Sequence, residues 1–292
     1  MIVPSWRQAV LALAALCCAA GPAAAEPALW CVKGDKAVIY LFGTVHALKA
    51  DTKWRSPKID AAFKKSSELW LEVDEDIADP AKAMLMIRDL GLDWSHPLYT
   101  HLSKNDMALL DANARTAGIN DGEDTLDFFR PWAASMMLDG AAFKKAGYDT
   151  KDGVEVTLMT EAKAAKKPIK GMEGFGQHFH FLADLPPKVE LEMLKETVHD
   201  LENAPKRVGE VIEAWTQGDV DAIAKSNAEM KDSSPELYQT ILVQRNQNWA
   251  VKIADMMKEP QTRFIAVGAG HLAGPDSLLV QLQSAGITAE RL

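Results

Sequence analysis

The chain has 292 residues, which is enough to bury a substantial core in one large domain or two. Its formal net charge of −9 disfavours nonspecific binding to nucleic acid or anionic lipid, because both are themselves negatively charged. Of its three cysteines only Cys31 lies outside residues 1–25. If those residues are removed, the mature chain can form neither an intramolecular disulfide nor a multi-cysteine metal site.

Residues 1–25 have the pattern of a cleavable secretory signal peptide. Arg7 supplies a positive charge, residues 9–20 are apolar, and three alanines precede Glu26. The apolar run is too short for a membrane span. We therefore expect cleavage after Ala25, export to the periplasm or beyond, no stable membrane insertion, and one mature domain over residues 26–292.

The mature chain begins with two apolar segments, residues 29–32 and 37–42, which predict a β-hairpin around Gly34. The second segment leads into Gly43-Thr44-Val45-His46, so a histidine follows the end of a strand. A helix is predicted to begin at Pro57. The apolar run 69–73 then predicts a buried strand that carries Glu72 near its end.

After Glu72 the pattern becomes helical. Apolar spacing predicts helices at residues 80–90, 103–118, 131–146 and 154–166. Several more are predicted from 174 to 257, with a break near residues 233–235. A short strand at 168–173 places Glu173 at its end. In the last of these helices, residues 235–258, Arg245 and Trp249 are four positions apart and share one face. Residues 80–260 are therefore expected to form a long helical insertion.

The C-terminal stretch repeats the layout of the first unit. Residues 264–267 predict a buried strand, and Gly268-Ala269-Gly270-His271 follows it. A helix is predicted to start at Pro275 and to end before a short strand that carries Glu290. We interpret the two ends of the mature chain as two similar strand–GxxH–helix–strand units. These units are expected to form either two related small sheets or one mixed sheet. The predicted fold class is α/β.

The two histidines and the inner-strand acids form the candidate site. If the units pack as equivalent halves, His46 and His271 reach the same side of the sheet, beyond the carboxyl ends of strands. Two histidines with a carboxylate are the ligand set of many hydrolytic metal sites, and Glu72 or Glu173 can supply the carboxylate. The alternative role for Glu72 is a salt bridge to an arginine such as Arg245.

Other histidines give weaker signals. His178 and His180 lie two apart on a predicted helix and point to different sides, so we assign both to surface or core. No Walker loop, HExxH helix or GxSxG elbow occurs, and nucleotide binding is not expected.

Taken in order, these motifs resemble the TraB/GumN family, which includes the Tiki-type metalloproteases and is distantly related to erythromycin esterases and to a haem-binding, iron-regulated lipoprotein. The matching stretches are residues 41–46, 71–74, 171–173, 245–246 and 267–272. Two positions depart from the family pattern. Glu155 follows Gly153-Val154 where Gly-Val-Asp is expected, and Gly174 stands in place of the usual threonine.

The resemblance implies that His46, Glu72 and His271 line an active site and bind a divalent metal such as Mn, Co or Zn. Glu173 and Arg245 are implied as supporting catalytic residues, and Asn246 is a further candidate.

The sequence thus predicts an exported, metal-dependent, peptidase-like hydrolase that acts on a peptide or small-molecule substrate. The carboxylate that is not a ligand would be the general base, and Arg245 would stabilise an oxyanion or a substrate carboxylate. A metal-independent esterase-like hydrolase, with one histidine as base, is an alternative. A non-enzymatic protein that binds haem, iron or another small ligand is a second alternative. The oligomeric state is left open.

Overall fold

The computed structural model describes residues 25–73, 80–119 and 126–292. The expected signal peptide lies outside these ranges except for Ala25. Within them, no helix is both long and apolar enough to cross a membrane.

The strands are β1 Leu29–Lys33, β2 Val38–Thr44, β3 Glu68–Val73, β4 Ile169–Glu173, β5 Thr262–Gly268 and β6 Ala289–Arg291. The α-helices are α1 Pro57–Lys65, α2 Pro80–Gly91, α3 Lys104–Ala117, α5 Pro131–Lys145, α6 Val154–Ala164, α7 Phe175–Ala183, α8 Pro187–Asp200, α9 Ala204–Thr216, α10 Val220–Ser233, α11 Pro235–Tyr238, α12 Gln244–Met256 and α13 Leu278–Ser284. Short helical turns are η2 Leu98–Thr100, η3 Thr150–Asp152, η4 Gln239–Val243 and η5 Ala269–Leu272.

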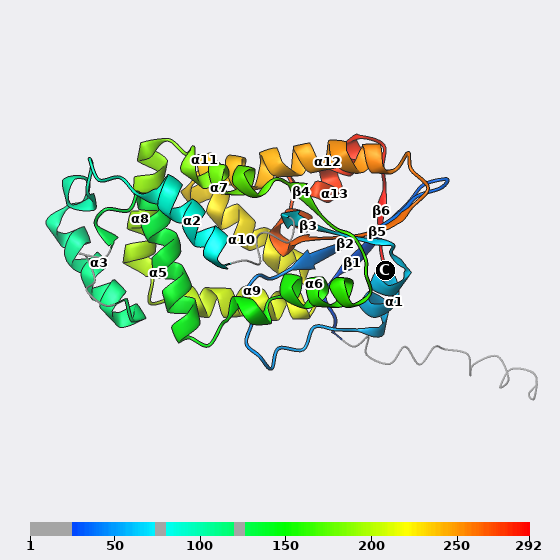
Figure 1. Cartoon of the computed structure of the whole chain (residues 1–292), viewed down its shortest axis with the longest axis horizontal. Helices are drawn as coiled ribbons and strands as arrows, with labels where there is room; N and C mark the ends of the chain where they lie inside the picture. Colours follow the sequence, from blue (N-terminus) through cyan, green and yellow to red (C-terminus); the bar gives the residue numbers. More distant parts are fainter. Residues whose placement is uncertain (1–24, 74–79, 120–125) are drawn as a thin grey trace, which may run out of the picture.

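One six-stranded mixed sheet organises this part of the chain, in the order β4-β3-β5-β2-β1-β6. β4, β3, β5 and β2 are parallel, whereas β1 runs antiparallel to both of its neighbours. Figure 1 shows the sheet edge-on between two helical layers. The α/β prediction is confirmed, and the chain forms one mixed sheet rather than two small sheets.

The two strand–GxxH–helix–strand units interleave instead of lying side by side. β5 of the second unit lies between β2 and β3 of the first, so His46 and His271 follow neighbouring parallel strands. From β2 the chain crosses the sheet in one direction to β3, and from β5 it crosses in the other direction to β6. Because such crossovers are right-handed, their helices are expected on opposite faces, and α1 and α13 do pack in separate core clusters.

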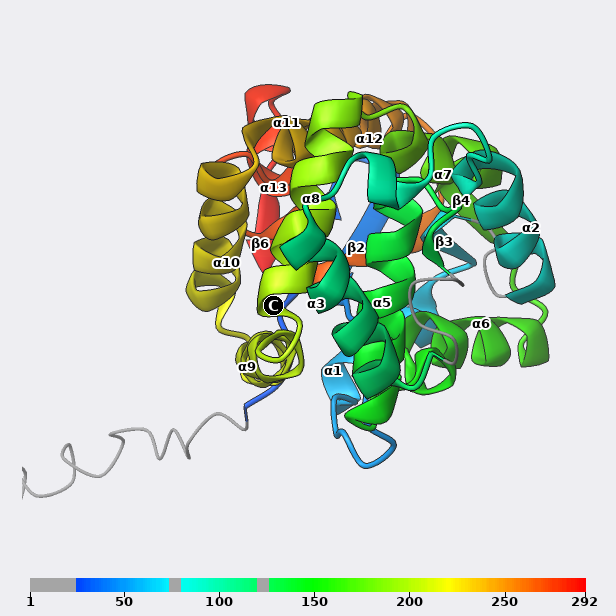
Figure 2. The same ribbon diagram turned by 90° about the vertical axis from the view of Figure 1, so that its left-hand side faces the viewer.

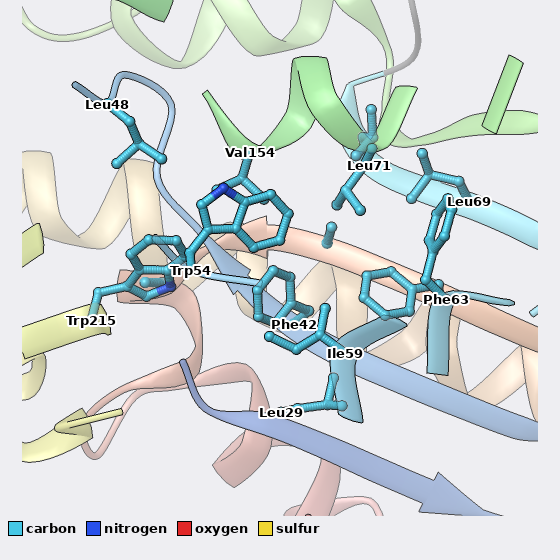
Figure 3. Close-up of a cluster of buried hydrophobic side chains, with 14 of the residues drawn as sticks. Leu29, Phe42, Leu48, Trp54, Ile59, Phe63, Leu69, Leu71, Val154 and Trp215 are labelled. Carbon is cyan, nitrogen blue, oxygen red and sulfur yellow. The ribbon is translucent and has the colours of Figure 1, made fainter. Parts of the chain in front are cut away.

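The cores on the two faces differ in composition. Buried aromatic side chains are more numerous on the face covered by α1, α6 and α9, where Phe42 stacks on Trp54 with ring centroids 5.9 Å apart (Figure 3). The other face is covered by α12 and α13, which bury Trp249 and Leu278 against β5. With both faces covered, β5 is buried along almost its whole length, as its continuous apolar run predicts.

The helical half of the molecule packs around its own core. α3, α5 and α8 share one apolar cluster, and α2, α5 and α7 share another, at the end of the molecule away from β6 (Figures 1 and 2). The expected insertion over residues 80–260 is thus largely helical. It also returns to the sheet, because β4 forms an edge strand and α6 covers one face.

One predicted boundary is wrong: α13 begins at Leu278 and not at Pro275. Ser277 caps the helix by accepting a hydrogen bond from the backbone N–H of Val280. The preceding loop is held by α10, where the Asn227 side chain donates to the backbone oxygen of Ala273 at 3.1 Å. Gly274, with a φ of 89°, also departs from helical geometry, so the helix starts only after it.

Candidate functional site

The candidate residues gather at the carboxyl ends of four adjacent parallel strands. His46 follows β2, Glu72 lies near the end of β3, Glu173 ends β4, and His271 lies in the η5 turn after β5. Polar groups that follow neighbouring parallel strands meet at one edge of the sheet, which is where α/β proteins bind ligands. The sequence prediction of a shared edge is therefore met by the strand order.

Gly268 marks the point where three of these side chains converge. A Cβ atom at this glycine would lie 3.0 Å from Glu72 Oε1, 3.6 Å from His271 Cδ2 and 3.8 Å from His46 Nε2. His46 Nε2 and His271 Cδ2 are therefore near each other, because both lie within 3.8 Å of this one point. The side chains of His46, Glu72 and His271 thus meet around the Cβ position that Gly268 leaves unfilled.

His46 approaches this space from the α6 side and is held by Glu155. Its Nδ1 lies 2.8 Å from Glu155 Oε1, and the Thr44 hydroxyl donates to the same oxygen. The negative charge of Glu155 raises the pKa of His46 to about 9. The His46 side chain is 64% exposed.

The Gly-Val-Glu stretch that departs from the family pattern therefore has a clear local role. Gly153 lies directly against the His46 backbone, because a Cβ there would be 2.2 Å from the His46 carbonyl oxygen. The N–H of Val154 donates to the Val45 carbonyl at 3.2 Å. Glu155 then reaches the imidazole, so this stretch docks α6 on the GTVH turn.

Arg245 is buried at the centre of the opposite side of the site. It donates through Nη2 to Glu72 Oε2 at 2.5 Å and to Glu173 Oε1 at 2.7 Å, and through Nε to Glu173 Oε2 at 3.0 Å. Its Nη1 contacts the Ile241 carbonyl at 3.1 Å and His271 Nε2 at 3.2 Å. A guanidinium has five N–H donors, and these five contacts use all of them.

The backbone that presents Arg245 is unusual. α11, η4 and α12 form one continuous helix, and η4 is a π-helical turn over Gln239–Val243 that ends two residues before Arg245. Such turns occur mostly as single insertions in α-helices and are frequent at functional sites. The predicted helix at 235–258 is correct, but apolar spacing gave no sign of this turn.

His271 is buried and its tautomer is set by Asn246. Its Nδ1 lies 2.7 Å from Asn246 Oδ1, while the Asn246 amide nitrogen donates to the Asp276 carbonyl at 2.9 Å. The asparagine oxygen is thus the acceptor, so Nδ1 carries the proton and Nε2 has the lone pair. Burial lowers the pKa of His271 to about 3, so the ring is neutral at physiological pH.

Glu72 links the two sides of the site. Its Oε1 accepts from the backbone N–H of Gly268 at 2.6 Å and lies 3.7 Å from His271 Nε2. Burial alone would raise the pKa of Glu72, but the positive charge of Arg245 holds it well below its ordinary value. The salt bridge to Arg245, which the sequence left as an alternative, is present.

Glu173 connects the network to His178, which sequence reasoning assigned to surface or core. His178 Nδ1 lies 2.8 Å from Glu173 Oε1. Among the described residues, Glu72, Glu173 and His178 each offer a ligand atom within 4.8 Å of the others. Arg245 Nη2 lies between the two carboxylates, so a guanidinium already occupies that position.

The structure thus brings together every sequence-predicted site residue: His46, Glu72, Glu173, Arg245, Asn246 and His271. Sequence reasoning missed Glu155 and His178. As argued, His178 and His180 do not converge, because His180 pairs with Asp184 on the surface. The overlooked signal was that His178 follows Glu173 by five residues, close enough to fold back on it from the start of α7.

Fold and site together define an α/β protein with a network of histidines, carboxylates and one arginine at the carboxyl edge of a mixed sheet. The chain belongs to the TraB/PrgY/gumN family, whose model matches residues 28–291. It is 24% identical over 242 residues to the uncharacterized protein YbaP of Escherichia coli strain K12, covering 82% of this chain and 85% of that protein. The YbaP protein of Shigella flexneri matches to the same extent. No solved structure matches the chain.

Proposed function

We propose that this protein is an exported hydrolase that holds a divalent metal ion between His46, Glu72 and His271. The observation that carries the proposal is the convergence of these three side chains on Gly268. They come from separate strands, and each has a dedicated partner that fixes its orientation: Glu155, Arg245 and Asn246. Such supporting contacts are typical of metal ligands.

Two of the three donors are already spaced for one small divalent ion, whereas His46 has to come closer, because among the described residues it is not in the group whose ligand atoms lie within 4.8 Å of one another. Glu72 Oε1 and His271 Nε2 are 3.7 Å apart, a separation that one ion can span with two bonds of about 2 Å. Nε2 is the unprotonated nitrogen of His271, which is the form that binds metal. His46, whose pKa of about 9 leaves it protonated at neutral pH, has to release a proton to bind the ion. When bound, the ion would supply Lewis-acid polarisation of a substrate carbonyl and a bound water of lowered pKa.

Other side chains position the proposed metal ligands. Glu155 fixes the ring of His46, and Asn246 fixes the tautomer of His271. Arg245 keeps Glu72 ionised, and because its five donors are all engaged we assign it this positioning role rather than contact with an oxyanion. Its contact with His271 Nε2 competes with a metal, so ion binding has to lengthen it.

Proton transfer is assigned to His178. Glu173 binds its Nδ1, and no described residue hydrogen-bonds the other ring nitrogen. Glu173 itself is buried with both oxygens on Arg245, so it is better placed to orient a base than to act as one. A carboxylate–histidine pair is a common arrangement for general acid–base catalysis.

The test is ion binding combined with hydrolysis. Chelator-treated protein is titrated with Mn²⁺, Co²⁺ and Zn²⁺ by calorimetry, and His46→Ala and His271→Ala are compared with His180→Ala as a matched control. We expect one ion per chain, with affinity at least tenfold weaker in the first two variants and unchanged in the third. No binding, or equal affinity in all variants, would refute the metal site.

A metal-independent hydrolase is the second candidate, favoured by the Arg245 guanidinium that already neutralises Glu72. A panel of peptides and esters is assayed before and after chelation. Hydrolysis that survives complete removal of the ion supports this candidate, and hydrolysis that returns only with the ion supports the first.

Export is tested separately. We expect the mature protein to begin at Glu26 and to be found outside the cytoplasm. N-terminal sequencing of protein from cell fractions checks this, and an intact N-terminus in the cytoplasmic fraction would contradict it.

A further inference from the structure

A cavity of about 190 Å³ opens beside His46 and His178. Its apolar wall is formed by Leu71 and Val73 of β3 and by Val156 and Met159 of α6. The network described above uses none of these four side chains. The cavity therefore requires a separate explanation.

The shape of this wall follows from the two elements that build it. Leu71 and Val73 alternate with Glu72 along β3, so they face away from the Arg245 network and toward α6. Val156 and Met159 are three apart on α6 and share the face that meets the strand. Glu155 precedes Val156 directly, so the turn that holds His46 also sets one side of the cavity.

The size of the cavity limits what it can hold. An apolar protein cavity of roughly 150 Å³ is large enough for benzene. About 190 Å³ thus suits a single side chain of the size of leucine, methionine or phenylalanine. A charged side chain would lose part of its hydration against this wall. Glu72 and Glu155 disfavour an acidic one, and because they already pair with Arg245 and His46 they have little left to offer a basic one.

We propose that this cavity is a substrate subsite that takes one uncharged apolar side chain, aliphatic or phenyl, next to the group that is hydrolysed. The hydrolytic part of this statement rests on the proposed function. Selection of an apolar side chain does not, because it depends only on the wall formed by β3 and α6.

Binding can be measured without turnover. The metal-free protein, labelled with ¹³C at its methionine methyl groups, is titrated with the N-acetyl amides of leucine, phenylalanine, glycine and glutamate. Burial of a leucine side chain should make its amide bind about tenfold or more tightly than the glycine amide. The Met159 methyl signal should shift with the leucine and phenylalanine amides. Equal affinities for all four amides would overturn the proposal.

Two variants locate the effect. Val156→Met fills the cavity from a half-buried position and leaves the core intact, so it should abolish the preference for leucine amide. Thr160→Met, on the exposed face of the same helix, is the matched control and should keep the preference. Unchanged leucine binding in Val156→Met would show that the cavity is not the site.

The outcomes separate this inference from the proposed function. Hydrolysis of peptides or esters with no preference for an apolar side chain would refute the subsite and leave the hydrolase standing. Selective binding of the leucine amide, with no hydrolysis under any metal condition, would refute the hydrolase and leave the subsite standing.

Discussion

At the scale of single residues, the glycines of the two GxxH motifs are needed for different reasons. A Cβ at Gly43 would lie 3.0 Å from the Cα of Ala269, so this glycine lets β2 pack against the η5 turn. A Cβ at Gly268 would instead enter the space between the two histidines and Glu72. The first glycine serves the fold, and the second keeps the site open.

We therefore predict that Gly268→Ala impairs the site more than the fold. The backbone of Gly268 has a φ of −48°, which alanine adopts without strain, but the new methyl group would displace Glu72 Oε1. Metal affinity and kcat/KM should fall about tenfold or more, with the unfolding temperature within a few degrees of wild type.

Gly140→Ala is the control for this substitution, because it adds the same methyl group to α5 in open space. It should leave the site unchanged and gain up to about 1 kcal/mol of helix stability. Wild-type metal affinity in Gly268→Ala would contradict the assignment of an ion site next to Gly268.

At the scale of elements, α7 carries a matched pair of histidines. His178 pairs with buried Glu173 and lines the cavity, whereas His180 pairs with exposed Asp184. We predict that His178→Gln lowers kcat by about 100-fold, the usual contribution of a general acid or base. His180→Gln should leave kcat within twofold. Steady-state kinetics on both variants checks this, and equal effects would remove His178 from the mechanism.

Helix α5 carries a carboxyl group that makes stability depend on pH. Burial raises the pKa of Asp139 from 3.8 to about 6. The folded protein therefore binds a proton that the unfolded chain has lost, so this group makes the fold less stable as pH rises from about 4 to 6.

Asp139→Asn removes this penalty. We predict that the variant is more stable than wild type by about 1–3 kcal/mol at pH 7.5 and nearly equal to it at pH 4. Urea unfolding at the two pH values measures the difference. A variant that is less stable than wild type at pH 7.5 would show that the carboxylate makes a favourable contact, for example with Arg207.

At the scale of the whole molecule, the sequence predicted the sheet well because its inner strands are buried on both faces and appear as uninterrupted apolar runs. It also placed His46 and His271 at one edge, since both follow such runs. It could not show that β5 inserts between β2 and β3, because strand order depends on pairing between distant segments. Glu155 was missed for the same reason: its contact with His46 spans 109 residues.

The sheet also separates the edge that carries the candidate site from the opposite edge. Glu68 and Glu72 lie on the same face of β3, about 13 Å apart at the usual rise per residue. Each pairs with a buried arginine: Glu72 with Arg245 at the carboxyl edge, and Glu68 with Arg263 at the opposite edge at 3.3 Å. Lys170 also donates to Glu68 at 2.6 Å.

We predict that Glu68→Gln lowers stability and leaves the chemistry intact. Loss of the carboxylate removes one of the two negative charges that pair with the buried Arg263 guanidinium, the other being Glu259, and should cost about 1–3 kcal/mol. Thermal unfolding should show a lower midpoint, while metal affinity and kcat of the folded protein stay at wild-type values. Glu72→Gln is the matched substitution at the other edge and should abolish metal binding and activity. A loss of metal affinity in Glu68→Gln comparable to that in Glu72→Gln would mean that the two edges are coupled through β3, and that the site depends on the whole strand rather than on its carboxyl end.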